Sequence, residues 1–202
     1  MMDLAVTLRP ARPEPGEGLL FARYLDEAAE GFFGFMLGSN SKNIIAAAYL
    51  EPGHALSYEH VLFAERDGVV VGMTLAYTGT QQHGFSDEPL KRAAGRTVLR
   101  MKLIRFFLAP LWRILEKIPE ADFYLQGIAV DADLRGAGVG SILMDDVEKR
   151  GREAGARRLA LDVSAKNMGA RRMYKRRGMI ESSEWPSSRL LPTLFVHMTK
   201  DL

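Results

Sequence analysis

The stretch from Tyr124 to Gly178 constrains the fold of this chain more than any other part of its sequence. A strand-like run, YLQGIAV, and a short link precede the loop RGAGVG at 135–140, which leads into an amphipathic helix. A second strand and a helix carrying Asn167, Ala170 and Tyr174 follow. Glycines before a helix N-terminus let backbone N–H groups approach an anion closely. This order predicts an anion-binding loop beside a strand, with a phenol on the next helix.

Bulk composition limits the kinds of site the chain can carry. A length of 202 residues predicts one domain spanning 1–202, which is long enough to bury a core. The absence of cysteine excludes a disulfide scaffold, a thiolate metal site and a cysteine nucleophile. The four histidines form no visible ligand cluster, so no metal is expected. Neither a signal peptide nor an apolar run of spanning length is readable, so a cytoplasmic protein without a transmembrane segment is expected.

The remaining elements indicate a mixed α/β (α+β) domain around a central sheet. Asp67-Gly68 between two β-rich runs is a strong hairpin signal. From Lys91 to Lys117, eight Lys or Arg face one acid, and apolar residues recur at helical spacing. We therefore expect a helical insert at about 87–118, between the third and fourth strands and broken near Pro110. The other expected elements are strands at Leu4–Leu8, 60–65, 69–77, 123–130, 159–163 and 194–198, and helices at 18–37, 43–50, 138–154 and 167–177.

The glycine loop has competing interpretations. It is not a phosphate-binding loop of the GK[ST] type, because no such tripeptide follows. Gly136 and Gly138 fit a dinucleotide fingerprint, and Asp162 lies near the place of a ribose-binding acid, but Ser141 replaces the third glycine or alanine. Five residues also separate the strand from the first glycine, whereas that fingerprint follows its strand directly. A glycine-rich connection without a ligand is the plain alternative.

The whole constellation resembles a known family. Arg135-x-x-Gly138-x-Gly140 resembles the [Q/R]-x-x-G-x-[G/A] motif of the GNAT superfamily of N-acetyltransferases. GIAVDADLRGAGVGSILM and AKNMGARRMYKRRGM are similar to that family's two coenzyme A segments, and the strong resemblance covers 123–180. It implies a GNAT-like acyl-CoA N-acyltransferase fold with a mixed, mostly antiparallel sheet that is flanked by helices and splays after Val130. It also implies acetyl-CoA as cosubstrate and a primary amine as acceptor, the transfer passing through a tetrahedral intermediate.

The resemblance also assigns roles to individual residues. The strand backbone at Ile128 and Val130 would bind the pantetheine arm and the thioester carbonyl, and the amides of 135–141 would hold the pyrophosphate. Asn167 would bind the cofactor arm, and Tyr174 would point at the sulfur as the catalytic general acid. The implied cofactor-binding residues are Ile128, Ala129, Val130, Arg135, Gly136, Ala137, Gly138, Val139, Gly140, Ser141, Asn167 and Tyr174.

The residues themselves support part of this assignment. Positions 167, 170 and 174 share one helix face, and small Ala170 leaves room for a ligand between the two polar side chains. The plain alternative is that Asn167 caps the helix and Tyr174 is buried, because such caps are common.

The general base is where the chain departs from many relatives, in which a Glu or His stands at the positions of Tyr124 and Gln126. Either a water chain reaches Glu65, Asp122 or His60, or the acceptor amine arrives with a lowered pKa. The acceptor and the size of the acyl group stay open.

The main alternative is a basic nucleic-acid-binding or membrane-surface module without catalysis. Lys166–Arg177 carries six basic residues without an acid, and the insert is also basic. A coenzyme A site favours positive charge as well, and cations are favourable at a helix C-terminus. Nucleic acid and peripheral membrane contact are therefore not expected as partners, while a homodimer stays open. We expect the first two helices and the insert to select the acceptor.

Overall fold

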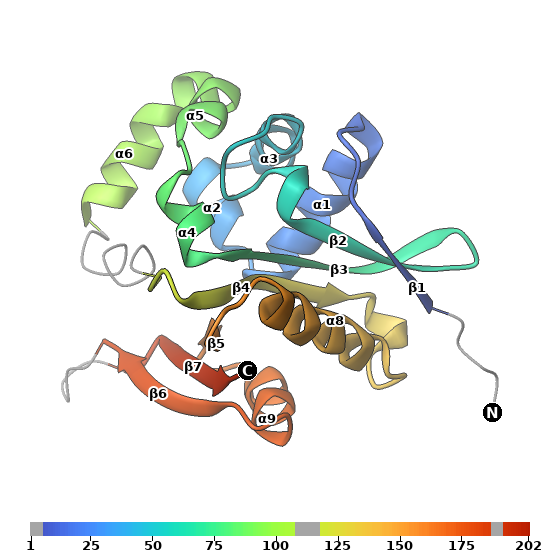
Figure 1. The fold of residues 1–202 in the computed structure, drawn as a ribbon. Coiled ribbons are helices and arrows are strands. Elements are labelled where there is room, and N and C mark those ends of the chain that lie inside the picture. Colours follow the sequence, from blue (N-terminus) through green and yellow to red (C-terminus); the bar gives the residue numbers. More distant parts are fainter. Residues whose placement is uncertain (1–5, 108–117, 187–191) are drawn as a thin grey trace.

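A computed structural model of the chain describes residues 6–107, 118–186 and 192–202 (Figure 1). Its centre is a seven-stranded sheet with the order β1-β2-β3-β4-β5-β7-β6. Only β4 and β5 pair in parallel among the described strands, so the mixed, mostly antiparallel sheet is confirmed. The strands are β1 (Val6–Pro10), β2 (Val61–Arg66), β3 (Val69–Thr78), β4 (Asp122–Val130), β5 (Arg158–Ser164), β6 (Ile180–Trp185) and β7 (Phe195–Asp201).

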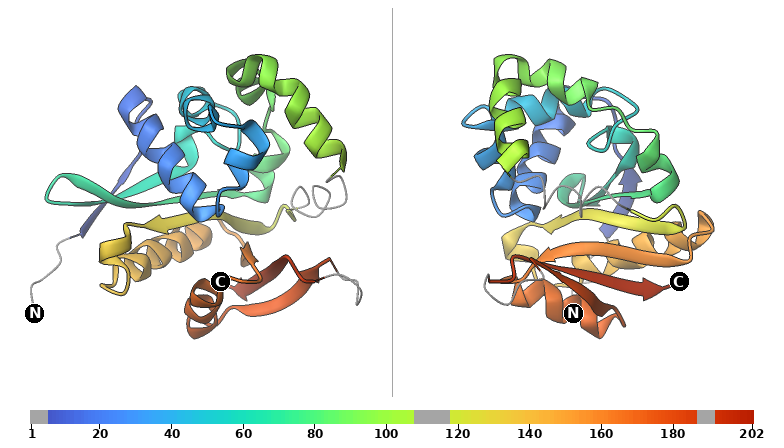
Figure 2. Two further views of the ribbon diagram at one scale, coloured as in Figure 1. Left: turned by 180° about the vertical axis from the view of Figure 1, so that it is seen from behind. Right: turned by 90° about the vertical axis from the view of Figure 1, so that its left-hand side faces the viewer.

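Helices cover both faces of the sheet (Figures 1 and 2). Helices α1 and α3 bury a large core against β2, β3 and β4 on one face. Helix α8 packs on the opposite face, where it shares an apolar cluster with α9 and strands β4, β5 and β7. The α-helices are α1 (Pro15–Ala28), α2 (Phe32–Leu37), α3 (Ser41–Tyr49), α4 (Gly79–His83), α5 (Glu88–Ala94), α6 (Val98–Phe107), α8 (Val139–Glu153) and α9 (Met168–Arg176). Short 3-10 helices are η1 (Tyr58–His60), η2 (Gly95–Thr97) and η3 (Ala132–Leu134).

The β2–β3 hairpin forms where Asp-Gly predicted it. Arg66 pairs with Val69, so Asp67 and Gly68 make the whole turn. Their φ angles are 52° and 76°, the positive values that a tight hairpin turn of this twist requires.

The predicted helix at 18–37 is wrong in one respect, because it is two helices. Glu30 and Gly31 take φ angles of 51° and 81°, which end α1 before α2 begins. The Gly31 amide donates to the Asp26 carbonyl oxygen at 2.9 Å, closing the end of α1. Apolar periodicity continues through this break, and only the glycine signals it.

The helical insert lies between β3 and β4, as predicted. It contains α4, α5 and α6, and the part from 108 to 117, with Pro110, lies outside the described residues. A capping box of Thr78 and Gln81 starts α4 directly after β3. The Arg100 side chain donates to the Phe35 carbonyl oxygen at 2.8 Å, which ties α6 to α2.

Strand β6 was not among the predicted elements. It is an edge strand whose residues are all exposed or half-buried, so its sequence lacks the apolar alternation that marks a strand. It pairs antiparallel with β7, which is close to the predicted last strand.

Candidate functional site

Strands β4 and β5 separate part of the way along their length. Their parallel pairing runs from Asp122–Arg158 to Leu125–Leu161 and then ends, although β4 continues to Val130 and β5 to Ser164. The expectation that the sheet splays after Val130 was therefore wrong, because the opening begins directly after Leu125. Residues 126–130 of β4 therefore lie beyond its last pairing with β5.

A β-bulge turns part of the β4 backbone towards the opening. Leu75 of β3 pairs with Gly127 while the next residue, Ala76, pairs with Leu125, so Gln126 is an extra residue. The Asp131 amide donates to the Val71 carbonyl oxygen of β3 at 3.0 Å.

Backbone amides along a strand point alternately to its two sides. The Asp131 contact with β3 therefore shows where each preceding β4 amide points. The amide of Ala129 points towards β3, whereas those of Ile128 and Val130 point towards the opening. The amides at both predicted backbone contacts are thus directed away from β3. Ala129, predicted together with them, has its amide directed into the β3–β4 ladder instead.

Only some backbone amides of the glycine loop are available to a ligand. Within the described chain, Arg135, Ala137 and Ser141 already donate their amides to the carbonyl oxygens of Ala132, Leu134 and Gly138 at 3.4, 3.2 and 2.9 Å. The amides with no acceptor among the described residues are those of Gly136, Gly138, Val139 and Gly140. These four groups surround the N-terminus of α8, where backbone donors and the helix dipole favour an anion.

The glycines themselves are required by backbone geometry. Gly136 and Gly138 have φ angles of 82° and 96°, which L side chains rarely adopt. A Cβ at either residue would meet nothing within 4 Å, so the space over the loop is open to a ligand. The loop therefore fits a bound pyrophosphate in both donors and room.

The Arg135 side chain holds the loop to its surroundings. Its Nε donates to the Val130 carbonyl oxygen at 3.1 Å, and its Nη2 lies 3.3 Å from the Glu27 carboxylate of α1. The motif has Arg or Gln at this position, and that is the sequence signal for the side-chain contact. The resemblance assigned a role only to the Arg135 amide.

Helix α9 lies next to the loop and is capped by Asn167. The Asn167 Oδ1 accepts from the Ala170 amide at 3.0 Å, so the capping interpretation is correct. The Asn167 side-chain NH2 has no partner in the described part of the chain, so capping does not exclude a second role. A Cβ on Gly140 would lie 3.8 Å from Met173 Sδ and 3.9 Å from Val130 Cγ2, so α8, α9 and the end of β4 meet there.

Tyr174 is buried in the cluster on the α8 face of the sheet, with 5% of its surface exposed. Burial raises the pKa of its phenol, so the hydroxyl stays protonated at neutral pH. No hydrogen bond to this hydroxyl is made by the residues that the structure describes. Tyr174 is therefore a buried, neutral phenol.

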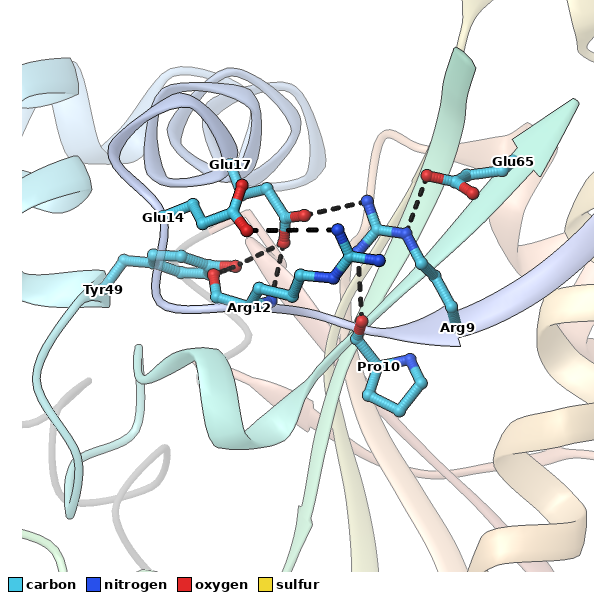
Figure 3. Close-up of polar contacts among 7 residues, drawn as sticks. All are labelled: Arg9, Pro10, Arg12, Glu14, Glu17, Tyr49 and Glu65. Carbon is cyan, nitrogen blue, oxygen red and sulfur yellow. Dashed lines mark hydrogen bonds and ion pairs between the residues drawn. The ribbon is translucent and has the colours of Figure 1, made fainter. Parts of the chain in front are cut away.

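Two of the three predicted base candidates are held in ion pairs. Figure 3 shows Arg9 between Glu65 and Glu17, with its Nε 2.7 Å from Glu65 Oε1 and its Nη2 2.8 Å from Glu17 Oε1. Asp122 is 1% exposed and accepts from Arg158 Nε and Nη2 at 3.1 and 3.0 Å. Both carboxylates are therefore already engaged by an arginine.

The third candidate, His60, is buried in a cluster of aromatic side chains. Its ring lies 4.8 Å from Phe85 and 5.7 Å from Tyr77, centroid to centroid. Burial lowers the pKa of the imidazole, so it stays neutral. Its Nε2 is buried with no hydrogen-bond partner among the described residues.

Sequence reasoning missed a polar group near the start of the opening. Tyr124 donates to Asp162 Oδ2 at 2.9 Å, and Asp162 Oδ1 lies 3.0 Å from His197 Nδ1. The sequence indicates Asp162 only as a candidate ribose-binding acid, whereas in the structure its carboxylate contacts Tyr124 and His197. No local pattern links Asp162 with His197, because they belong to different strands.

The basic run on α9 is partly neutralised. Arg171 and Lys175 both pair with Glu181, at 2.7 and 3.1 Å. Arg177 pairs with Asp145 and Glu148. The run is therefore a weaker polycation than its sequence indicates.

The part of the chain that the structure describes contains no group of three His, Cys, Asp or Glu side chains able to hold a metal ion. None of its described helices combines the length and apolar character needed to cross a membrane.

Comparison with known proteins bears on this arrangement. The model of a family described as the acetyltransferase (GNAT) family matches residues 40–179. Among curated proteins, no sequence matches the chain.

Solved structures share the fold at low sequence identity. One, an acetyltransferase, is 24% identical with a TM-score of 0.65, covering 96% of this chain and 98% of its own. An N-acetyltransferase from Staphylococcus aureus Mu50 is 17% identical with a TM-score of 0.65, covering 96% and 100%. The ribosomal-protein-S18-alanine N-acetyltransferase from Escherichia coli is 13% identical with a TM-score of 0.54, covering 97% and 93%.

Proposed function

The chain belongs to the GNAT acetyltransferase family, and from this premise we propose that it transfers an acetyl group from acetyl-CoA to a primary amine. The acceptor would be a small molecule or the amine of a peptide or protein, which makes the chain an acyltransferase of class EC 2.3.1. One observation carries the proposal. The opening between β4 and β5 has the amides of Ile128 and Val130 along one side, and at its end lie four loop amides that have no acceptor among the described residues.

These features fit the parts of acetyl-CoA. The amides of Gly136, Gly138, Val139 and Gly140 would hold its pyrophosphate. The amides of Ile128 and Val130 would bind the pantetheine arm and the thioester carbonyl, as β-strand additions do. The Asn167 NH2 would donate to the same arm.

Direct transfer requires three things of the protein. It must position a neutral amine, stabilise the oxyanion of the tetrahedral intermediate and protonate the departing sulfur. A strand amide facing the carbonyl can stabilise the oxyanion by roughly 3–4 kcal/mol, as in other oxyanion holes. Tyr174, kept protonated by burial, would supply the proton to sulfur. No enzyme nucleophile is needed, which suits a chain without cysteine.

We further propose that residues 1–202 act as one domain in the cytoplasm, with the cofactor bound by 123–180. The acceptor would enter from the face that carries α1 and α2, beside the insert at about 87–118. This arrangement places the two substrates on different elements, so each can be tested separately. Homodimer formation is compatible with this proposal and is measured by light scattering.

The alternative of a nucleic-acid-binding or membrane-surface module finds no support in the family match or the related structures. Arg171, Lys175 and Arg177 also form ion pairs, which neutralise three of the six basic residues on which that alternative rested.

A coenzyme A release assay against small amines, antibiotics and peptide N-termini tests the proposal. Acetyl-CoA should also raise the melting temperature, because it binds only the folded state. Absence of both stabilisation at millimolar acetyl-CoA and release with every amine would refute it.

A further inference from the structure

Three side chains from three strands form one hydrogen-bonded row on the sheet. Tyr124 of β4 donates to Asp162 of β5 at 2.9 Å, and the second oxygen of Asp162 lies 3.0 Å from Nδ1 of His197 on β7. Strand register explains the row. Tyr124 pairs with Ala160, which is two residues before Asp162 on the same face, and Asp162 stands directly opposite His197.

The row lies where the two parallel strands part. Pairing of β4 with β5 ends at Leu125–Leu161, so Asp162 is the first residue of β5 beyond it. Leu125 and Leu161 pack with Tyr174 on the face covered by α8 and α9. Since neighbouring strand residues point to opposite faces, Tyr124 and Asp162 lie on the other face. The row and Tyr174 thus lie on opposite faces of the sheet, at the start of the opening.

His197 is both oriented and accessible. The Asp162 side chain is 10% exposed and that of His197 is 30% exposed. A carboxylate at Nδ1 favours the neutral tautomer that carries its proton there, which leaves Nε2 with a free lone pair. No described residue contacts this Nε2 through a hydrogen bond. A histidine held by a carboxylate, with its second nitrogen free, is the arrangement of a general base.

We infer that His197 Nε2 accepts the proton that the acceptor amine loses, an inference that rests on the proposed transferase function. As the nitrogen bonds to the thioester carbon and the carbon–sulfur bond breaks, the nitrogen's proton passes to Nε2 and the sulfur takes a proton from Tyr174. The products are an amide and a thiol, and solvent returns both side chains to their starting states. Asp162 and Tyr124 are positioning residues in this scheme.

Neither of the two positions at which many relatives carry a base supplies one in this chain. Gln126 is an amide and cannot accept a proton at neutral pH. The pKa of Tyr124 is raised well above its usual value, first by burial and then by Asp162, so it stays a hydrogen-bond donor. Tyr124 therefore holds the carboxylate that orients His197.

Few charges surround the His197 ring among the described residues. The Asp162 carboxylate of β5 is in contact with it, and the neutral Tyr124 of β4 stands behind that carboxylate. Strand β6 places uncharged Ser183 opposite His197. The same-face neighbours on β7 are also uncharged, and they are Phe195 and Thr199. Asp162 is therefore the charged partner of the His197 ring among the described residues.

The test compares His197→Gln and Asp162→Asn with the wild type. The matched control is His83→Gln on α4, since His83 also has a carboxylate partner, Glu120 at 3.3 Å, and is half exposed. The dependence of kcat on pH is measured with two acceptors whose amine pKa values differ, about 8 for an α-amine and about 10.4 for a lysine side chain. An acidic limb that is the same with both acceptors belongs to the enzyme.

We expect His197→Gln to lower kcat by roughly 10²–10⁴-fold and to remove that shared limb. The stabilisation by acetyl-CoA should not change, and His83→Gln should behave as the wild type. A His197→Gln enzyme with wild-type kcat and an unchanged limb would overturn the inference while leaving the transferase proposal intact. A wild-type protein that neither binds acetyl-CoA nor acetylates any amine would overturn both.

A second measurement needs no acceptor. Long-range ¹H–¹⁵N correlation NMR reports which ring nitrogen of neutral His197 carries the proton. We expect the Nδ1–H tautomer in the wild type and a mixture in Asp162→Asn. An Nε2–H tautomer in the wild type would overturn the inference, because the nitrogen assigned to catalysis would then have no free lone pair.

Discussion

The carbonyl oxygen of Val130 accepts a hydrogen bond from Arg135 Nε at 3.1 Å. Because the N–H and C=O of a strand residue point the same way, this carbonyl faces the opening and is already satisfied by the protein. The Val130 amide is then the backbone group that this residue can offer to a ligand. The contact also sets where the glycine loop starts relative to the end of β4.

Arg135→Met should weaken acetyl-CoA binding, because it removes the donor to Val130 and releases the start of the loop. The unfolding free energy should fall by about 1 kcal/mol, a typical net value for one hydrogen bond. Arg135→Gln keeps a side-chain N–H and should retain more affinity. Calorimetric titration with acetyl-CoA and urea denaturation measure both effects. Equal affinities for the Met and Gln variants would contradict this role.

Gly138→Asp should abolish acetyl-CoA binding, since a carboxylate would lie beside the amides proposed to hold the pyrophosphate. Gly138→Asn has the same shape without the charge, and Asn tolerates positive φ better than most residues. Both variants should lose about 1–2 kcal/mol of stability, because Gly138 has a φ angle of 96°. Only the Asn variant should still gain thermal stability from acetyl-CoA. If both variants bind alike, the loop does not hold an anion.

Asn167 can be tested for its two roles separately. Asn167→Ala removes the cap to Ala170 and should cost about 1 kcal/mol of stability. Asn167→Asp keeps a capping oxygen but lacks the NH2 donor, so stability should be retained while acetyl-CoA affinity falls. Thermal melts with and without acetyl-CoA separate the effects. An Asp variant that binds like the wild type would leave Asn167 with a capping role alone.

Tyr174→Phe should lower kcat by roughly 10²–10⁴-fold if protonation of the sulfur limits the rate. Acetyl-CoA affinity and stability should change little, because no described residue hydrogen-bonds the lost hydroxyl. Tyr58→Phe is the control, a half-buried tyrosine of η1 that packs on Tyr49. Wild-type turnover in Tyr174→Phe, measured by coenzyme A release, would remove Tyr174 from its role.

The insert should affect the acceptor and not acetyl-CoA. Its exposed cations include Arg96 and Lys102, whereas Arg100 is bound to Phe35 and the Arg105 side chain lies outside the described residues. Replacing Arg96 and Lys102 with Gln should raise KM about two- to fivefold for an acceptor bearing a carboxylate or phosphate, as expected for exposed charges.

Lys149→Gln, an exposed cation on α8, is the control for this double variant and should leave KM unchanged. Loss of acetyl-CoA affinity with unchanged acceptor KM in the double variant would place the insert on the cofactor side.

Much of the fold was predictable because its signals are local. The Asp67-Gly68 turn, the glycine loop before α8 and the shared face of Asn167, Ala170 and Tyr174 each depend on residues close in the chain. The spacing of apolar residues did not predict the helix break at Glu30–Gly31 or the strand β6. In the first case one glycine interrupts a continuous apolar pattern, and in the second an exposed edge strand has no apolar pattern to detect.

By itself the sequence determined most of the order of elements, the family and the glycine loop before α8. Only the tertiary structure decided where the opening begins, which loop amides stay free, and which charged candidates are taken up in ion pairs. It also decided the meeting of Asp162 and His197, which are 35 residues apart. The physical reason is strand register. Pairing between β5 and β7 places the two side chains opposite each other, and register arises from the packing of the whole sheet and not from either strand alone.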